Sequence, residues 1–254
     1  MAKKNYISLQ GKFYLSEIVN GVAGAMRHLG NVPEFELEIG ADVIEHKESM
    51  TGQRTTDFTM VNATSVAFSG QLEEVDAENL KYILSGMNYE VATRTATDES
   101  LGTVVAGQEI ELDGYNLKTV SFKDSTSGTA KTVDPEDYTL DAKFGTVIFN
   151  DVSDLTMPIL ATYTTGAVTN TTFASDFNTE YKLFFKGVNT ASGDSVAVTL
   201  WRTKKSPETT FPLIHEELGS YSISGQALAD ITKQSDAQLG LYGHIVTIPN
   251  AVTP

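Results

Sequence analysis

The sequence has 254 residues, no cysteine and a formal net charge of −15 at pH 7, with 41% hydrophobic residues. The lack of cysteine excludes a disulfide framework and thiolate chemistry. The acidic balance disfavours binding to nucleic acid, because phosphate contacts require clustered Lys and Arg. Abundant Val, Thr, Tyr and Phe, with few helical patterns, predict a mainly β protein.

The first clear strand follows a turn-forming stretch, LGNVP, at residues 29–33. In the next segment, EFELEI, apolar and acidic side chains alternate, which is typical of a strand with one buried face. The apolar positions are Phe35, Leu37 and Ile39, and the acidic ones are Glu34, Glu36 and Glu38. We expect the three glutamates to share the solvent face of this strand.

A second alternating segment lies at residues 62–75, with Val66, Phe68 and Leu72 on its apolar face. Two half-buried strands separated by a polar stretch predict a long antiparallel hairpin. We place its turn in SMTGQR, residues 49–54, with Gly52 supplying a positive φ.

The polar stretch at residues 44–60, IEHKESMTGQRTTDFTM, crowds several chemically capable side chains into one short segment. Such crowding suggests either a catalytic or ligand-binding loop or a surface that contacts another protein. An extended hairpin needs no second segment to form a pocket wall, so we predict a contact arm. The candidate contact residues are His46, Glu48, Ser49, Gly52 and Arg54. Glu48 and Arg54 are candidates for charge pairs across a subunit or ring boundary, and Gly52 for the bend.

One amphipathic helix is predicted over residues 77–85, because Asp76 is a good N-cap and Gly86 suits a helix end. Its apolar stripe consists of Leu80, Ile83, Leu84 and Met87. We expect this stripe to pack on a sheet.

The remaining sequence divides at two polar stretches, 93–102 and 164–178, which we interpret as junctions. Between them lie five short strand candidates: QEIELDG, KTVSFKD, EDYTLD, GTVIFND and PILATYT. After them come four longer strand candidates: EYKLFFKGV, DSVAVTLWRT, SYSISGQAL and YGHIVTI. We therefore predict a discontinuous β core, residues 1–95 and 169–254, with an inserted small β-sandwich-like domain at 96–168.

No motif predicts an enzyme, a metal site or a cofactor site. His215, Glu216 and Glu217 resemble the start of a zinc-protease motif, but the second His is missing at the required spacing. The chain contains no GxSxG turn, GxGxxG loop or Walker sequence. The opening residues, MAKKNYISLQ, do not have the apolar run of a secretory signal. We expect no catalytic residues, cofactor or metal, and no membrane insertion.

Three segments in this order resemble the N-terminal half of tail tube (major tail) proteins of long-tailed bacteriophages. They are GNVPEFELEI, ESMTGQRTTDFTM and VAFSGQLEEVDAENLKYILSG, and the resemblance covers about residues 10–90. A weaker similarity covers residues 175–248, and EDYTLDAKFGTVIF resembles a recurrent piece of the β module inserted in such proteins.

The resemblance implies a β-sandwich or barrel core with a flanking helix and a long hairpin arm. It implies hexameric rings that stack into a tube, with the arm reaching an adjacent ring. Tail terminator, tape measure and tail-tip proteins would be further partners, and the subunit would be made in the host cytoplasm and end in the virion tail. DNA would pass the lumen without specific binding, and Glu34, Glu36 and Glu38 are the lumen-facing candidates.

Two other functions compete with a phage tail tube. One is the inner tube of a bacterial contractile injection or type VI-like system. The other is a β-sandwich carbohydrate-binding or adhesin module, which would need surface aromatic residues on one face. Trp201 is the only Trp, and its strand neighbours suggest that it is packed.

Overall fold

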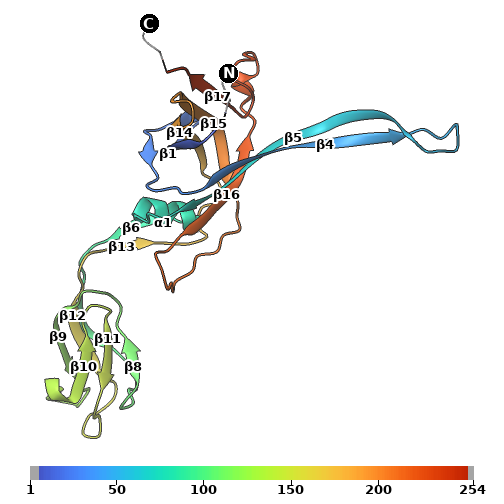
Figure 1. The fold of residues 1–254 in the computed structure, drawn as a ribbon. Coiled ribbons are helices and arrows are strands. Elements are labelled where there is room, and N and C mark those ends of the chain that lie inside the picture. The colour runs from blue at the N-terminus through green and yellow to red at the C-terminus, as the bar shows by residue number, and fades with distance from the viewer. Residues whose placement is uncertain (1–5, 251–254) are drawn as a thin grey trace. The chain divides into compact units, whose positions relative to one another are not determined.

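The computed structural model of the protein describes residues 6–250 and is mainly β, with several antiparallel sheets (Figure 1). Unit 1 takes the chain up to Met87 and again from Thr171, and unit 2 comprises Asn88–Asn170. We predicted boundaries at 95/96 and 168/169. Residues 1–5 and 251–254 of the predicted core lie outside the described residues.

Within residues 6–250, unit 1 contains a nine-stranded antiparallel sheet in the order β2-β1-β14-β15-β16-β5-β4, with β3 added to β1 and β17 to β15. Its strands are β1 (Leu9–Val19), β2 (Val22–Ala23), β3 (Arg27–His28), β4 (Phe35–Lys47), β5 (Thr56–Leu72), β14 (Glu180–Asn189), β15 (Ser195–Lys205), β16 (Tyr221–Leu228) and β17 (Gly243–Ile248). The four C-terminal strands and the β4–β5 hairpin confirm the sequence predictions. Strand β1 was not predicted.

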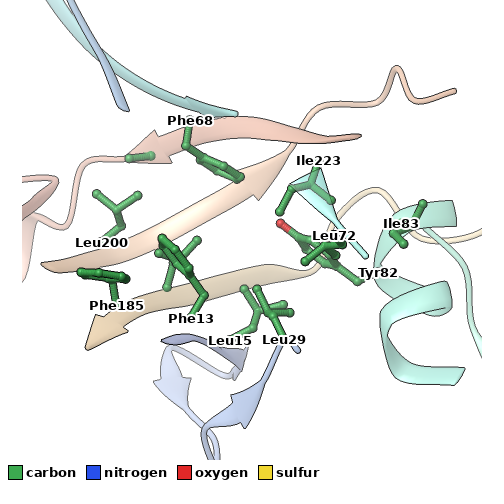
Figure 2. Packing of buried hydrophobic residues seen from close by; sticks show 12 residues of the cluster. Phe13, Leu15, Leu29, Phe68, Leu72, Tyr82, Ile83, Phe185, Leu200 and Ile223 are labelled. Carbon is green, nitrogen blue, oxygen red and sulfur yellow. The ribbon is translucent and has the colours of Figure 1, made fainter. Parts of the chain in front are cut away.

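Aromatic side chains hold the curled sheet together around its inner face (Figure 2). The Phe13 ring of β1 lies 4.4 Å from that of Phe35 on β4 and 4.8 Å from that of Phe185 on β14, measured between centroids. Phe35 also stacks on Phe68 of β5 at 5.8 Å. Strands β1 and β4 are far apart in the sheet order, so these contacts require the sheet to curl around one core. Burying each such side chain contributes about 1.5–3 kcal/mol.

The opposite face of β4, β5 and β16 is polar. Glu36 of β4 lies opposite Ser69 of β5, and Ser69 lies opposite Ser224 of β16. Because every second residue of a strand points to the same face of the sheet, the side chains at every second position from these residues share this face. Its members are Glu34, Glu36, Glu38, Ser69, Gln71, Ser222, Ser224 and Gln226. The prediction that the three glutamates are exposed is confirmed.

The predicted helix is α1 (Ala77–Leu84), and the Asp76 side chain accepts a hydrogen bond from the Asn79 amide at 2.7 Å. The left-handed residue at its end is Ser85 (φ 49°), not Gly86 as expected. Gly86 instead allows close approach of the returning chain, since an added Cβ would lie 1.7 Å from the Thr172 carbonyl oxygen.

The buried face of α1 differs in part from the predicted stripe. Ile83 is buried, but Met87 is exposed and Tyr82 and Asn79 are buried instead. The side-chain amide nitrogen of Asn79, Nδ2, donates to the carbonyl oxygens of Leu29 and Glu74, which allows a polar group to be buried.

The end of α1 is fixed to the sheet by Lys205. Its ammonium group donates to the Ile83 carbonyl oxygen and, at 2.9 Å, to the Ser85 hydroxyl. Burial lowers the pKa of Lys205 to about 8. A cation at this position also interacts favourably with the helix dipole.

Unit 2 contains two three-stranded sheets, in the orders β10-β11-β8 and β7-β12-β9, and the ribbon β6–β13, among the described residues. Its strands are β6 (Asn88–Val91), β7 (Thr95–Ser100), β8 (Glu109–Glu111), β9 (Lys118–Lys123), β10 (Tyr138–Asp141), β11 (Thr146–Phe149), β12 (Leu160–Thr164) and β13 (Val168–Thr171). All five predicted strands of this region are present. The two sheets share one core, in which Phe122 of β9 lies 5.1 Å from Phe149 of β11 between centroids.

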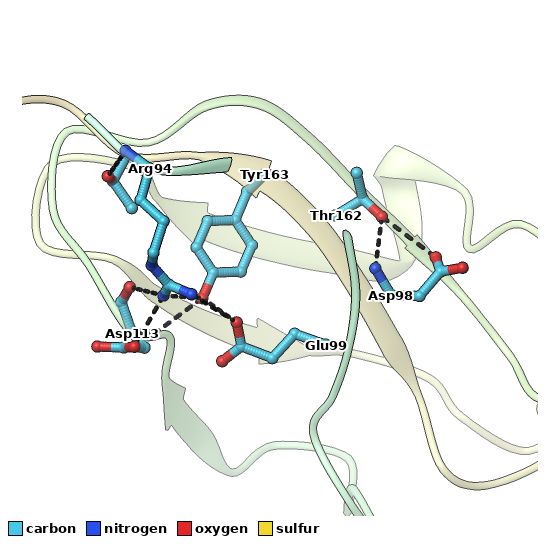
Figure 3. Close-up of polar contacts among 7 residues, drawn as sticks. Arg94, Asp98, Glu99, Asp113, Thr162 and Tyr163 are labelled. Carbon is cyan, nitrogen blue, oxygen red and sulfur yellow. Dashed lines mark hydrogen bonds and ion pairs between the residues drawn. The ribbon is translucent and has the colours of Figure 1, made fainter. Parts of the chain in front are cut away.

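The predicted linker at 93–102 is wrong, because most of it forms strand β7, paired with β12. A polar network explains why so polar a segment is ordered (Figure 3). The buried Tyr163 hydroxyl donates to Glu99 at 2.9 Å and accepts from the Asp113 amide at 3.1 Å. Arg94 donates to the Asp113 carboxylate at 2.8 Å and lies 3.6 Å from that of Glu99. Burial raises the pKa of Tyr163.

We expect Gly86→Ala to destabilise unit 1 by about 1–3 kcal/mol, the usual effect of overpacking. Trp201 is the only Trp and lies in unit 1, so its fluorescence during chemical denaturation of the full chain reports on this unit. Gly24→Ala is the control, since its Cβ would meet only the Glu17 carbonyl oxygen at 3.4 Å. Equal denaturation midpoints for the two variants would contradict the close-approach role of Gly86.

Candidate assembly interface

The β4–β5 hairpin extends as an arm beyond the rest of unit 1 (Figure 1). Strand β16 pairs with β5 only between Val66 and Leu72, whereas β4 stays paired with β5 out to Lys47 and Thr56. The outer part of the arm is therefore a two-stranded ribbon. At about 3.3 Å per residue, its eight β4 residues from Gly40 to Lys47 span roughly 25 Å.

Two β-bulges bend the arm, each marked by a cross-strand polar pair. The strand register shifts between Asp42 and Val43, which leaves Asn62 of β5 without a partner residue on β4. The side-chain amide of Asn62 donates to the Asp42 carboxylate at 2.9 Å. A second shift after His46 leaves Asp57 extra, and His46 Nδ1 lies 2.6 Å from the Asp57 carboxylate. Bulges increase local twist and re-aim side chains.

The loop at the end of the arm is closed by Glu48. Its side chain, only 8% exposed, accepts hydrogen bonds from the amides of Met50 at 2.7 Å and Thr51 at 2.9 Å, and from the Thr51 hydroxyl. Its own amide donates to the Thr55 carbonyl oxygen at 2.9 Å. The hydrogen bonds from Thr51 and Met50 lower the pKa of Glu48.

The five predicted contact residues lie on this arm, but not all of them meet. Gly52 (φ 79°) and Arg54 (φ 52°) both adopt left-handed backbone in the loop, and Ser49 is exposed beside Glu48. Within residues 6–250, Arg54 forms no ion pair, and Glu48 is engaged by the loop itself rather than by Arg54. Arg54 thus remains open to contact, whereas Glu48 shapes the loop.

Exposed apolar side chains on the arm were missed by the sequence reading. Val43 pairs with Val61 on one face of the ribbon, and Ile44 pairs with Met60 on the other. The exposed apolar residues of the arm are Ile39, Val43, Ile44, Met50, Phe58, Met60 and Val61. The signal in the sequence was the adjacent apolar pairs, Val43–Ile44 and Met60–Val61, which break strict alternation and so place apolar groups on both faces.

Trp201 is not a flat exposed platform of the kind a carbohydrate-binding face would use. Its indole nitrogen donates to the carbonyl oxygens of Leu239 and Gly240, and its ring packs edge-on against His244 at 4.9 Å. The ammonium groups of Lys182 and Lys233 lie over the ring, at 5.6 and 5.3 Å. These contacts agree with the packed position that the sequence suggested.

Among the described residues, no group of three or more His, Asp or Glu side chains is placed to hold a metal ion. Within the same residues, no helix is both long and apolar enough to cross a bilayer.

A family model described as "Protein of unknown function UCP028589" matches residues 6–246. The chain belongs to this family. The match takes in both units and the whole arm, so the hairpin and the inserted unit lie within the span that defines the family. A comparison with curated proteins found no match.

We expect Glu48→Gln to loosen the loop, because a neutral amide is a weaker acceptor for the Thr51 and Met50 amides than a carboxylate. Lys47 and Arg54 flank the loop, so trypsin should cut the variant faster at neutral pH. Glu45→Gln is the matched control on the same arm, and equal cleavage rates would contradict the role of Glu48.

The loop should also depend on pH in a defined direction. Because folding lowers the pKa of Glu48, its stabilising effect is complete above the ordinary carboxyl pKa and is lost as pH falls through the lowered value. The protection of the Thr51 amide against hydrogen exchange, corrected for the intrinsic rate, should fall with it. If the Thr51 amide loses protection over the same pH range in Glu48→Gln, a group other than Glu48 causes the pH dependence.

Proposed function

We propose that this chain is a structural subunit that assembles with copies of itself into stacked hexameric rings, forming the tail tube of a long-tailed bacteriophage. The observation that carries the proposal is the two-stranded arm with exposed apolar residues on both faces. The sequence resemblance supplies the ring and tube geometry, and the arm supplies a physical need for a partner.

An isolated two-stranded ribbon is at best marginally stable in water. Contiguous exposed apolar surface on a soluble protein typically marks an interaction site. Burying Ile44, Phe58 and Met60 against a neighbouring subunit would contribute about 1.5–3 kcal/mol for each side chain before the cost of association. In the proposed tube the arm of one ring contacts the next ring, with Arg54 presented at its tip.

The polar face of β4, β5 and β16 supports a second part of the proposal, that this face lines the channel. It presents Glu34, Glu36 and Glu38 beside short Ser and Gln side chains. Acidic and neutral groups form no lasting contacts with phosphates, so DNA can slide past them. Tail terminator, tape measure and tail-tip proteins would be further partners in the virion tail, and the chain would have no enzymatic role.

Replacing Ile44 and Phe58 together with Ser should abolish tubes, because it removes apolar area from the arm without touching the core of unit 1. Electron microscopy of the concentrated proteins measures the outcome, and circular dichroism checks the fold. Thr59→Ser is the control on the same strand. Wild-type protein that stays monomeric even with tail-assembly partners would overturn the proposed function. Normal tubes from the double variant would show that the apolar side chains of the arm are not needed for assembly.

Reversing the channel charge in Glu36→Lys/Glu38→Lys should leave tubes intact but make them retain DNA. Linear duplex DNA should co-sediment with the variant tubes at low salt and be released as salt rises, because lysine–phosphate contacts release counterions. A variant with two lysines placed at the exposed acids Glu109 and Glu111 of unit 2 controls for net charge. Equal DNA retention by both variants would place Glu36 and Glu38 outside the channel.

A further inference from the structure

The connection between β15 and β16 presents a second exposed apolar feature. We call residues 211–218 the apolar hook. Leu213, Ile214 and Leu218 are 84%, 93% and 97% exposed, among the highest values for large apolar side chains in residues 6–250. Glu216 and Glu217 lie between them, and neither forms an ion pair within the described residues.

The root of the hook is fixed to unit 1. The Phe211 ring stacks on that of Tyr221 at 4.7 Å with an interplanar angle of 19°, and His215 Nε2 lies 3.2 Å from the Tyr221 hydroxyl. These contacts hold the residues on either side of Leu213 and Ile214 against the first residue of β16. The apolar tip is thus presented outward from an anchored base.

The same unit carries an apolar groove of about 700 Å³ between β1 and β4. Leu9, Phe13, Phe35, Leu37, Val198 and Ile245 are among the residues that line it. One edge of the groove is the start of β1, where residues 9–12 pair with β14 on one side and, among the described strands, with none on the other. The groove is therefore open along a strand edge.

Two lysines lie next to this edge, on the face of the sheet opposite to Phe13. Lys12 of β1 stands directly opposite Lys186 of β14, and neither forms an ion pair within residues 6–250, although the Lys186 ammonium lies over the Tyr14 ring at 5.7 Å. Like charges in direct cross-strand positions are destabilising. In a chain with a net charge of −15, two lysines that lack a carboxylate partner and lie close to an apolar groove fit a partner that is both acidic and apolar.

The hook meets this requirement, but within one copy it leaves the groove open. The groove reaches the Ser195 end of β15 at Leu9, whereas its β4 side, at Phe35, is in register with Ile223 of β16. The hook follows the Lys205 end of β15, and Leu213 and Ile214 do not line the groove. The hook tip and the groove are therefore both uncovered in a single copy.

We propose that the apolar hook of one copy docks in the β1–β4 groove of a second copy, in a head-to-tail contact. Leu213 and Ile214 enter the groove, while Glu216 and Glu217 reach around the edge of β1 to Lys12 and Lys186. Three residues of extended chain span about 10 Å, enough to pass from one side of a strand to the other. A contact between two different surfaces propagates into a filament when its rotation does not close.

This inference rests on the proposed self-assembly and adds the surfaces that propagate it. A second copy is favoured over another protein because one head-to-tail contact covers the hook and the groove of successive copies alike. It also gives Lys12 and Lys186 carboxylate partners.

Cysteine crosslinking tests the contact, since the natural chain has no cysteine. Leu213→Cys and Gln10→Cys are made in separate full-length chains of different tag size, mixed and oxidised. We expect a disulfide-linked pair of unlike chains in several-fold higher yield than with Ile231→Cys, an exposed apolar position outside the hook, in place of Leu213→Cys. Glu216→Lys/Glu217→Lys in the hook chain should lower the yield, and Lys12→Glu/Lys186→Glu in the groove chain should restore it.

A yield no higher than that of the Ile231→Cys control, while wild-type tubes still form, overturns the docking and leaves the proposed function standing. The charge pairing is overturned if reversing the hook charges lowers the yield and reversing the groove charges does not restore it. Absence of wild-type rings and tubes overturns the proposed function, and the crosslink yield then still decides whether hook and groove meet.

Discussion

The structure of unit 1 depends on one interaction, the aromatic contact that joins strands distant in the sheet order. Phe13 of β1 packs against both Phe35 of β4 and Phe185 of β14. Because Phe35 sits at the base of the β4–β5 hairpin and also stacks on Phe68, this contact fixes the root of the arm. The same curl leaves the groove between β1 and β4 open and turns the acidic face of β4 away from the core. One packing requirement thus positions the root of the arm, the groove and the acidic face.

Those surfaces share a physical property, since each is ordered at its root and incompletely covered at its tip. Glu48 closes the arm loop, and two bulges set the direction of the ribbon, yet its apolar side chains remain in water. The hook is likewise anchored by Tyr221. A protein that functioned as a monomer would carry these features as aggregation risks. In a protein that polymerises, they become the contacts themselves.

Local patterns in the sequence were sufficient for much of the fold. Alternation predicted the β4–β5 hairpin and the four C-terminal strands, and Asp76 predicted the helix start, because these depend on neighbouring residues. Strands β1 and β7 were missed because β1 owes its order to β14, and β7 to the Tyr163–Glu99–Arg94 network. We assigned Gly86 to the helix end, but glycine is required there because the Thr172 backbone, far away in the sequence, leaves no room for a side chain.

The candidate site divides in the same way. The sequence by itself determined a mainly β chain, an acidic strand face and a long polar hairpin, since composition and period-two alternation carry that information. Only the tertiary structure decided that Glu48 is used within its own loop, that the arm exposes apolar groups on both faces, and that the hook tip and the groove are both left uncovered in one copy. Register shifts, strand pairing and sheet curl set these positions, and each depends on contacts between residues that are distant along the chain.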